Sequence, residues 1–496
     1  MAARLGPDSL ASLPPEVRRP GYDRAALSPG ILHLGVGAFH RCHQGDWTDD
    51  ALEADFGPWG IRGVNLAPPD LAPTLGAQDG LYCRELREAG RSDLRLIGAV
   101  IGTASVGTPR GAATARAWAA DPATRIVTMT VTEKGYRHHP ATGDLDLDHP
   151  AIVADLADPA SATSVPGFVT RMLRDRAEHG TAPPILISCD NVPDNGATLR
   201  RCVLGYAAAI DPALADLIGS KVTFLDTMVD RIVPATRDAD RDRFEAATGL
   251  RDEALVVGEP FRMWVIQDRG ATLPAWDRGG AIVVPDVRPY EILKMRVVNG
   301  IQSNLCQLGL LAGVEFMADV MADAVFAEFA ERTIRREVIP HLPEVPGVDL
   351  DGYLVTTLGR LANPDLRHAT AQISTDGSQK IRQRLLDPLR DARRAGGPWQ
   401  GLALGIAGWM GYMRGVDHAG RPHPVEDPLA SRARDIAQTA GSARERVAGM
   451  LAIREVFGTD LCEDSELVDT LSIFADALER RPARDVVRDG LAAQAA

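Results

Sequence analysis

"ILHLGVGAFHR", residues 31–41, decides the fold of the first half of the chain, because an apolar run leads straight into Gly35-Val36-Gly37. Two glycines at this spacing let the backbone turn tightly after a strand and approach a pyrophosphate at the following helix N-terminus. The third glycine position of the usual fingerprint holds His40, whose side chain would push the helix away from the strand. Taken alone, the stretch is equally consistent with a dinucleotide-binding loop and with an ordinary strand-to-helix turn.

Short apolar runs alternate with helical patterns up to about residue 287. The runs are "ILHLGVG", "IRGVNL", "LRLIGAVIG", "RIVTMTVTE", "PILISCDN", "KVTFLDTMV" and "AIVVPDV". Strands separated by helices in this way predict a parallel sheet covered by helices. We therefore predict a Rossmann-type dinucleotide-binding domain over residues 1–287.

From residue 288 the chain is predicted to be almost wholly helical, with apolar residues recurring every three or four positions. Examples are "EILKMRVVNGIQSNLCQLGLLAG", "VMADAVFAEFAERTIRREVI" and "LALGIAGWMGYM". The predicted fold class is therefore α/β, with an N-terminal Rossmann-type parallel sheet followed by an all-helical C-terminal domain over residues 288–496.

The composition predicts a soluble globular protein, with 45% hydrophobic and 24% charged residues among 496. A formal net charge of −13 argues against nucleic acid as a partner. The sequence shows neither a signal peptide nor a membrane-spanning run, so we expect the cytoplasm. Six widely spaced cysteines predict buried free thiols, and neither they nor the histidines follow a metal-ligand spacing, so no metal is expected.

Polar residues follow several of the predicted strands, where open α/β sheets build their sites. Asp70 is the only acid close after "IRGVNLAPPD" and would accept hydrogen bonds from the adenosine ribose, which favours NAD slightly over NADP. Asn191, in "SCDNVPDNG", could stabilise an oxyanion, but an Asx-turn that ends the strand is the simpler interpretation. Asp230 and Arg231, in "TMVDRIVPAT", could equally form a local ion pair.

The stretch "LKMRVVNGIQSNL", residues 293–305, carries polar side chains within an apolar helical pattern. If residues 291–313 form one helix, Lys294, Asn299 and Gln302 lie at about 0°, 140° and 80° around it. Such a flank usually faces solvent, but this one lies at the junction of the two predicted domains, where ligand pockets concentrate. Because burial lowers the pKa of a lysine, a lysine in such a cleft can act as a general base, and neighbouring amides can stabilise an alkoxide.

Five motifs in sequence order carry a resemblance to a known family. They are "GAFHRCHQ", "TVTEKGY", "SCDN", "MVDRIVPA" and K-x-x-x-x-N-G. Together they resemble the long-chain polyol-specific secondary alcohol dehydrogenases, the metal-free mannitol dehydrogenase family, from about residue 30 to beyond residue 410. "EPFRMWVIQD", "DGSQKIRQRLLDPLR" and Gln372, where mannitol dehydrogenases have arginine, resemble the fructuronate reductase (D-mannonate oxidoreductase) branch.

The resemblance implies NAD as cofactor, a Rossmann-type domain, a helical domain and a small sugar acid or polyol bound between them. It implies that Lys294 is the general base and that Asn191 and Asn299 stabilise the oxyanion. It assigns substrate contacts to Gln302, Asp230, Lys380 and Gln372. It assigns cofactor contacts to Leu34, Gly35, Val36, Gly37, Ala38, Phe39, His40 and Arg41, and we add Asp70 and Glu133.

The chain departs from the family pattern in the motif N-G-x-H, where Gln302 replaces histidine. Glutamine can still donate to and accept from a substrate hydroxyl, but it does not titrate. Arg382 also stands where the family has proline. The cation for a substrate carboxylate stays open among Lys380, Arg367 and Arg41.

Three functions are compatible with these residues. The first is NAD-dependent interconversion of D-mannonate and D-fructuronate. The second is a mannitol 2-dehydrogenase or another dehydrogenase of arabinitol or altronate, which the glutamine makes plausible. The third is a catalytically idle sugar-acid-binding protein, against which the intact Lys294, Asn191 and Asn299 argue.

Overall fold

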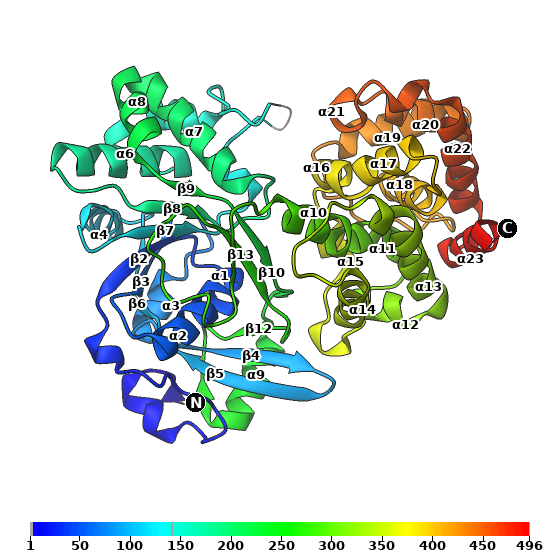
Figure 1. The fold of residues 1–496 in the computed structure, drawn as a ribbon. Coiled ribbons are helices and arrows are strands. Elements are labelled where there is room, and N and C mark those ends of the chain that lie inside the picture. The colour runs from blue at the N-terminus through cyan, green and yellow to red at the C-terminus, as the bar shows by residue number, and fades with distance from the viewer. Residues whose placement is uncertain (1–2, 140–141, 496) are drawn as a thin grey trace. The chain divides into compact units, whose positions relative to one another are not determined.

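The computed structural model describes residues 3–139 and 142–495. The chain forms two compact units, Met1–Arg288 and Pro289–Ala496 (Figure 1). The sequence placed the division between residues 287 and 288.

A six-stranded parallel sheet forms the centre of the first unit. Its strands are β2 (Pro29–Leu34), β3 (Gly60–Asn65), β6 (Val100–Ser105), β7 (Ile126–Met129), β8 (Ile185–Ser188) and β9 (Phe224–Leu225). The spatial order is β6-β3-β2-β7-β8-β9. In order along the chain this is 3-2-1-4-5-6, the Rossmann order, whose direction reverses between β2 and β7. The predicted fold class is confirmed.

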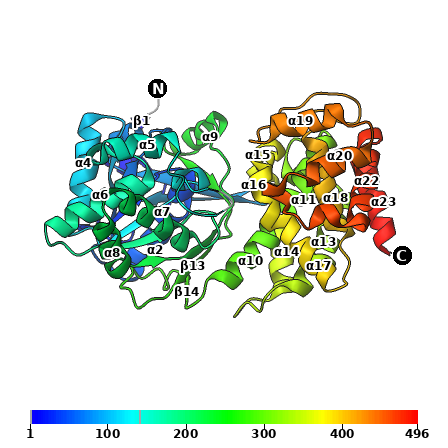
Figure 2. The same ribbon diagram turned by 90° about the horizontal axis from the view of Figure 1, so that it is seen from above.

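Alternate residues of these strands point to two separate hydrophobic cores. Ile31 and Ile126 pack on one face with Trp47 of α2, while Leu32 and Val127 pack on the other face. Helices α4, α6, α7 and α8 gather on this second side of the sheet (Figure 2). The helices of the unit are α1 (Ala38–Cys42), α2 (Gln44–Ala54), α3 (Ala72–Ala77), α4 (Pro109–Ala120), α5 (Pro150–Ala157), α6 (Val165–Glu178), α7 (Asn195–Ile210), α8 (Pro212–Lys221) and α9 (Asp238–Thr248).

The prediction of one strand per apolar run is wrong at two places. "LRLIGAVIG" forms β5 (Arg91–Ile97) and β6, because the carboxylate of Asp49 accepts the backbone N–H groups of Gly98 and Ala99 between them. "KVTFLDTMV" forms β9 and β10 (Thr227–Asp230), and the chain changes sheets between them.

Three smaller sheets complete the described part of this unit. β5 pairs antiparallel with β4 (Tyr82–Glu88), and β4 pairs parallel with β12 (Val256–Gly258). β13 (Met263–Gln267) lies between β10 and β14 (Ile282–Val284), and β14 is the predicted strand "AIVVPDV". That run therefore lies outside the main parallel sheet. The two-residue strands β1 (Ala3–Arg4) and β11 (Leu250–Arg251) also pair.

The second unit consists of helices. They are α10 (Arg288–Arg296), α11 (Val298–Leu311), α12 (Met317–Ala322), α13 (Ala324–Thr333), α14 (Leu350–Leu361), α15 (Thr370–Ser374), α16 (Gly377–Ile381), α17 (Asp387–Arg394), α18 (Gln400–Tyr412), α19 (Ala430–Thr439), α20 (Ala443–Leu451), α21 (Arg454–Phe457), α22 (Ser465–Arg480) and α23 (Ala483–Ala495). The predicted single helix over 291–313 is wrong, because the chain is divided at Val297 into α10 and α11.

The buried helices α11 and α18 pack closely because α18 has glycines at the contact. A Cβ atom on Gly405 would lie 1.7 Å from Oδ1 of Asn304, and one on Gly408 would lie 2.8 Å from Cδ2 of Leu308. A larger residue at either position would force the side chain of Asn304 or Leu308 to move, so the two glycines allow this close approach of the helices.

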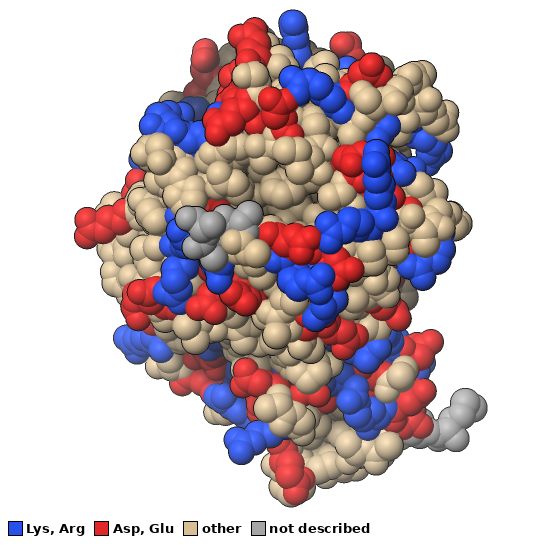
Figure 3. Space-filling model, turned by 90° about the vertical axis from the view of Figure 1, so that its right-hand side faces the viewer, with Lys and Arg blue, Asp and Glu red and all other residues tan. Residues whose placement is uncertain are grey.

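Acidic and basic side chains are intermixed over the face shown in Figure 3. Among the described residues, no helix combines the length and the apolar character needed to cross a membrane.

Candidate active site

The glycine turn after β2 has the geometry of a dinucleotide-binding loop. Gly35 has φ +93°, and a Cβ atom there would lie 2.3 Å from the carbonyl oxygen of Thr130. A Cβ atom on Gly37, by contrast, would have only the carbonyl oxygen of Gly35 within 4 Å, at 3.9 Å. The first glycine is therefore required by the turn itself, and the second leaves open space beside the backbone, as the approach of a pyrophosphate requires.

His40 does not push the helix away from the strand, contrary to the expectation from the sequence. Its ring stacks on the ring of His33 from β2, with centroids 3.6 Å apart. His33 is fixed by contacts with Thr128 Oγ1 at 2.8 Å and the carbonyl oxygen of Gly35 at 3.1 Å. Burial lowers the pKa of His33 to about 3 and also lowers that of His40, so both rings are neutral near pH 7. The stacked, neutral rings of His33 and His40 thus take the place of the close helix–strand contact that a third glycine usually allows.

Asn65, which the sequence analysis missed, lies at the end of β3 beside the loop. Its Oδ1 accepts the N–H of Val36 at 2.9 Å, while its buried Nδ2 has no hydrogen-bond partner among the described residues. Asp70 lies further along, is exposed, and accepts the N–H of Ala72 at the start of α3. An unpartnered donor beside the glycine turn fits a cofactor-binding role. The sequence feature that could have pointed to Asn65 is an amide residue directly at the end of a predicted strand.

The segments after β7 and β8 lie beside each other. Glu133 begins a short 3-10 turn, Glu133–Tyr136, and Asn191 is half-buried two residues beyond Cys189. The N–H of Cys189 donates to the carbonyl oxygen of Met129 at 2.9 Å, which holds the two strand ends together. Asp230 is buried at the end of β10 in the same unit.

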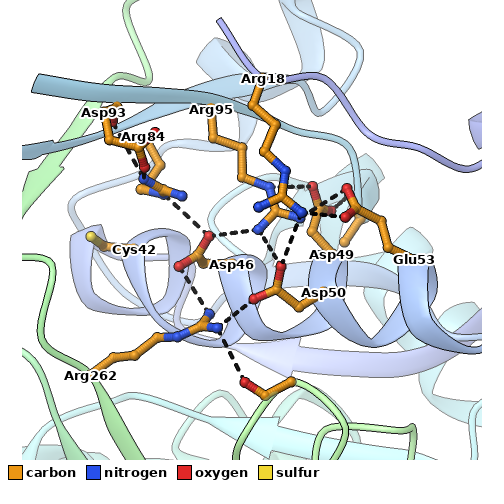
Figure 4. A network of polar contacts seen from close by, with 12 residues as sticks. Arg18, Cys42, Asp46, Asp49, Asp50, Glu53, Arg84, Asp93, Arg95 and Arg262 are labelled. Carbon is orange, nitrogen blue, oxygen red and sulfur yellow. Dashed lines mark hydrogen bonds and ion pairs between the residues drawn. The ribbon is translucent and has the colours of Figure 1, made fainter.

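Arg231 makes a longer-range contact than the local ion pair considered from the sequence. Its Nη1 donates to Asp46 Oδ2 at 2.9 Å and also to the carbonyl oxygen of Cys42. Asp46, on α2, belongs to a buried network that includes Arg84 of β4, Arg95 of β5 and Arg262, which precedes β13 (Figure 4). Burial alone would raise the pKa of Asp46, but the surrounding arginines hold it well below its usual range. These contacts fix the end of β10, which carries Asp230, to α1 and α2, the two helices that follow the glycine turn.

The predicted polar flank of the second unit is buried. Lys294, Asn299 and Gln302 are 7%, 8% and 7% exposed, which excludes the interpretation that this flank faces solvent. Within α11, Asn299 Nδ2 donates to Gln302 Oε1 at 3.1 Å. The structure therefore brings two of the predicted site residues into direct contact and buries the third on the adjoining helix.

Of the remaining residues from the sequence analysis, Lys380 is half-buried on α16 and its Nζ donates to the carbonyl oxygen of Thr375 at 2.5 Å. Gln372 is exposed on α15. Arg367 is exposed as well, with its guanidinium 3.9 Å from the ring centroid of Phe316. Arg382 is exposed and lines a hollow with Arg454.

Arg384 is a buried cation that the sequence analysis missed. It lies in the π-helical turn Arg382–Leu386, and its Nη1 donates to Ser303 Oγ at 3.1 Å. Ser303 directly follows Gln302 on α11, so this contact brings Arg384 close to the predicted site residues. Turns of this type are frequent at functional sites.

The six cysteines are free, and five are buried, whereas Cys462 is exposed, contrary to the expectation. Within 3–139 and 142–495 we find no group of three or more His, Cys, Asp or Glu residues arranged to hold a metal ion.

Comparison with known proteins agrees with this architecture. Residues 29–278 match the Mannitol dehydrogenase Rossmann domain, and residues 286–479 match the Mannitol dehydrogenase C-terminal domain. The oxidoreductase YdfI of Escherichia coli (strain K12) is 42% identical over 90% of this chain and 92% of its own length. D-mannonate oxidoreductase of the same strain is 40% identical over 95% of this chain and 97% of its own length.

A solved relative has the same overall chain path. The Pseudomonas fluorescens mannitol 2-dehydrogenase, in a ternary complex with NAD and D-mannitol, has a TM-score of 0.91 and 32% identity over 99% of both chains. The resemblance found in the sequence motifs is confirmed, and this chain belongs to the mannitol dehydrogenase family.

Proposed function

We propose that this oxidoreductase interconverts D-mannonate and D-fructuronate, with Lys294 as the general base. The observation that carries the proposal is the burial of Lys294 on α10, the helix that leads into α11, where Asn299 and Gln302 form a buried hydrogen-bonded pair. The choice of a sugar acid is supported by the D-mannonate oxidoreductase relative and by Gln372 in place of the arginine of mannitol dehydrogenases.

NAD is the cofactor, as the sequence predicted. The Rossmann strand order, the open space beside Gly37 and the unpartnered Nδ2 of Asn65 all fit a dinucleotide, and the solved relative contains NAD. Residues 34–41 would hold it, with the glycine turn at its pyrophosphate. When bound, NAD supplies the acceptor for hydride in alcohol oxidation, and NADH supplies the donor in the reverse direction.

The side chains perform the proton transfer and stabilise charge. In the oxidation, Lys294 takes the proton from the secondary hydroxyl group, and it returns that proton in the reduction. Asn191 and Asn299 donate amide N–H groups to the oxygen on which negative charge develops. Gln302 holds the amide of Asn299, and Asp230 accepts a hydrogen bond from a further substrate hydroxyl.

Lys380 is our choice for the cation that binds the substrate carboxylate. It is half-buried, whereas Arg367 is exposed and engaged with Phe316, and Arg41 is buried on α1, where its Nη1 donates to the carbonyl oxygen of Val36 at 3.4 Å. A charge-assisted hydrogen bond contributes about 1.5–3 kcal/mol, so Lys380→Met should raise KM for D-mannonate by roughly 10- to 100-fold. Arg367→Met is the control and should leave KM within about twofold. The opposite ranking of the two variants would assign the carboxylate to Arg367.

A mannitol 2-dehydrogenase is the second candidate, because the solved relative contains D-mannitol and Gln302 has no carboxylate-specific role. The test is the formation of NADH from D-mannonate, D-mannitol, D-arabinitol and D-altronate, with and without chelator. Preference for D-mannonate supports the proposal, and turnover only of a neutral polyol or of altronate replaces it. If none of the four compounds is turned over, the remaining candidate is a sugar-acid-binding protein without catalytic activity.

A further inference from the structure

Asp190 is a buried carboxylate at the strand ends to which the proposed chemistry assigns no role. It precedes Asn191 directly and is 7% exposed. Its Oδ1 accepts the N–H of Thr132 at 2.7 Å, and its Oδ2 accepts the hydroxyl of Tyr136 at 2.8 Å. One side chain after β8 therefore holds both ends of the turn that follows β7.

The backbone at Thr132 is strained, and Asp190 holds it. Thr132 has φ +62°, a region that a β-branched residue rarely adopts. Such conformations persist only where surrounding contacts maintain them, and they cluster at functional sites. The hydrogen bond from the Thr132 N–H to Asp190 is one contact of this kind, directly before Glu133.

The main chain of Asp190 is held by a second residue, Asn195 at the start of α7. Asn195 Nδ2 donates to the carbonyl oxygen of Asp190 at 2.9 Å and to that of Thr227 at 2.8 Å. The N–H of Thr227 donates back to Asn195 Oδ1 at 2.9 Å. Asp190 is thus held between the turn after β7 and the first residue of β10, the strand that ends at Asp230.

We propose that Asp190 is a positioning residue that fixes the amide of Asn191 for catalysis and couples it to the Thr132–Glu133 turn beside the cofactor loop. The inference rests on the proposed function, because it requires Asn191 to stabilise the oxyanion. The segment that leads into this turn contacts the cofactor loop two residues before Thr132, where Thr130 Oγ1 donates to the carbonyl oxygen of Gly35 at 2.8 Å. Burial also raises the pKa of Asp190 to about 7, and strongly shifted carboxyls concentrate at functional sites.

The test is a double-mutant cycle of Asp190 and Asn191, with kcat and KM measured for the substrate that the enzyme prefers. A small displacement of a catalytic group costs one or two orders of magnitude, so Asp190→Ala should lower kcat by roughly 10- to 100-fold. In the Asn191→Ala background the same change should lower kcat by less than about twofold, because the group it positions is already absent. KM should change little in both backgrounds.

Asp155 offers a matched control. It is 6% exposed in the same unit and likewise accepts two hydrogen bonds, here from the N–H groups of Thr163 at 3.1 Å and Ser164 at 2.8 Å, but it lies on α5 and does not follow a strand. Asp155→Ala should lower thermal stability and leave kcat of the folded enzyme unchanged. Asp190→Asn, which keeps one acceptor oxygen, repeats the cycle if Asp190→Ala fails to fold.

If the wild-type enzyme is active and Asp190→Ala lowers kcat equally in the wild-type and Asn191→Ala backgrounds, the positioning role of Asp190 is overturned while the proposed function stands. A wild-type protein that binds NADH but turns over none of the four substrates would overturn the proposed function and this inference with it. The two failures are therefore distinguishable in the same set of measurements.

Discussion

Asn299 and Gln302 are joined by a hydrogen bond of 3.1 Å, from the amide Nδ2 of the first to Oε1 of the second, one turn apart on α11. This contact uses one of the two N–H bonds of the Asn299 amide and leaves the other for a substrate oxygen. Both residues are buried, so the contact is protected from competing water. The glutamine that departs from the family pattern thus acts as an acceptor that does not titrate.

Gln302→His tests this relationship through its pH dependence. A neutral imidazole can accept the Asn299 N–H, but an imidazolium cannot, so the ratio of variant to wild-type kcat should fall as pH is lowered below about 6.5, because burial lowers the pKa of an imidazole from that value. Gln302→Leu removes the acceptor at every pH and should give a lower ratio that does not vary with pH. A flat ratio for the histidine variant would show that the acceptor at this position does not matter.

Lys294→Ala should lower kcat by about 10²- to 10⁴-fold, the usual contribution of a general base. Binding of NADH, followed by quenching of tryptophan fluorescence, should be unchanged, because the predicted cofactor residues lie elsewhere. Lys221→Ala, at the exposed end of α8, is the control and should retain full activity. Retained turnover by the Lys294 variant would remove the proposed base.

Asp46→Asn should destabilise the first unit strongly. The change leaves four arginines around a neutral side chain, and removing one partner of a buried ionic network costs about 3–5 kcal/mol. Asp238→Asn removes an exposed ion pair with Arg241 and should cost less than about 1 kcal/mol. Urea unfolding measures both, and similar losses for the two variants would contradict a structural role of the network.

The buried carboxyl group of Glu337 should make the free energy of unfolding of the second unit depend on pH. Its carboxylate accepts the N–H groups of Gly401 and Leu402 at the start of α18, each at 2.9 Å, yet burial raises its pKa from 4.5 to about 7. The folded state therefore binds more protons than the unfolded chain between about pH 4.5 and 7. Its free energy of unfolding must fall as pH rises through that window, by up to about 3 kcal/mol.

Glu337→Gln mimics the protonated form and should remove this decline. The difference in unfolding free energy between wild type and variant should favour the wild type more at pH 5 than at pH 8. Glu344→Gln, at an exposed carboxyl, is the control and should reproduce the wild-type dependence. A difference between wild type and Glu337→Gln that is the same at both pH values would contradict the prediction.

The fold class followed from local patterns, because apolar runs such as residues 31–34 and the helical periodicity after residue 288 depend on neighbouring residues. The division of one apolar run into β5 and β6 at Gly98 did not follow from such patterns, because it depends on Asp49, a residue 49 positions earlier in the chain. The contact of Arg231 with Asp46 spans 185 positions, and that of Arg384 with Ser303 spans 81. Such contacts depend on tertiary packing, which explains why the ionic network, Arg384 and Asn65 were missed, whereas the roles of Lys294 and Asn299 were inferred from a local motif and stay predictions.

The most direct test of the proposed activity is the ratio of kcat/KM for D-mannonate to that for D-mannitol, measured as NADH formation by the purified chain with NAD. We expect a ratio well above one, and a proportional loss of both activities in Lys294→Ala. A ratio below one would contradict the assignment of a sugar acid as the substrate.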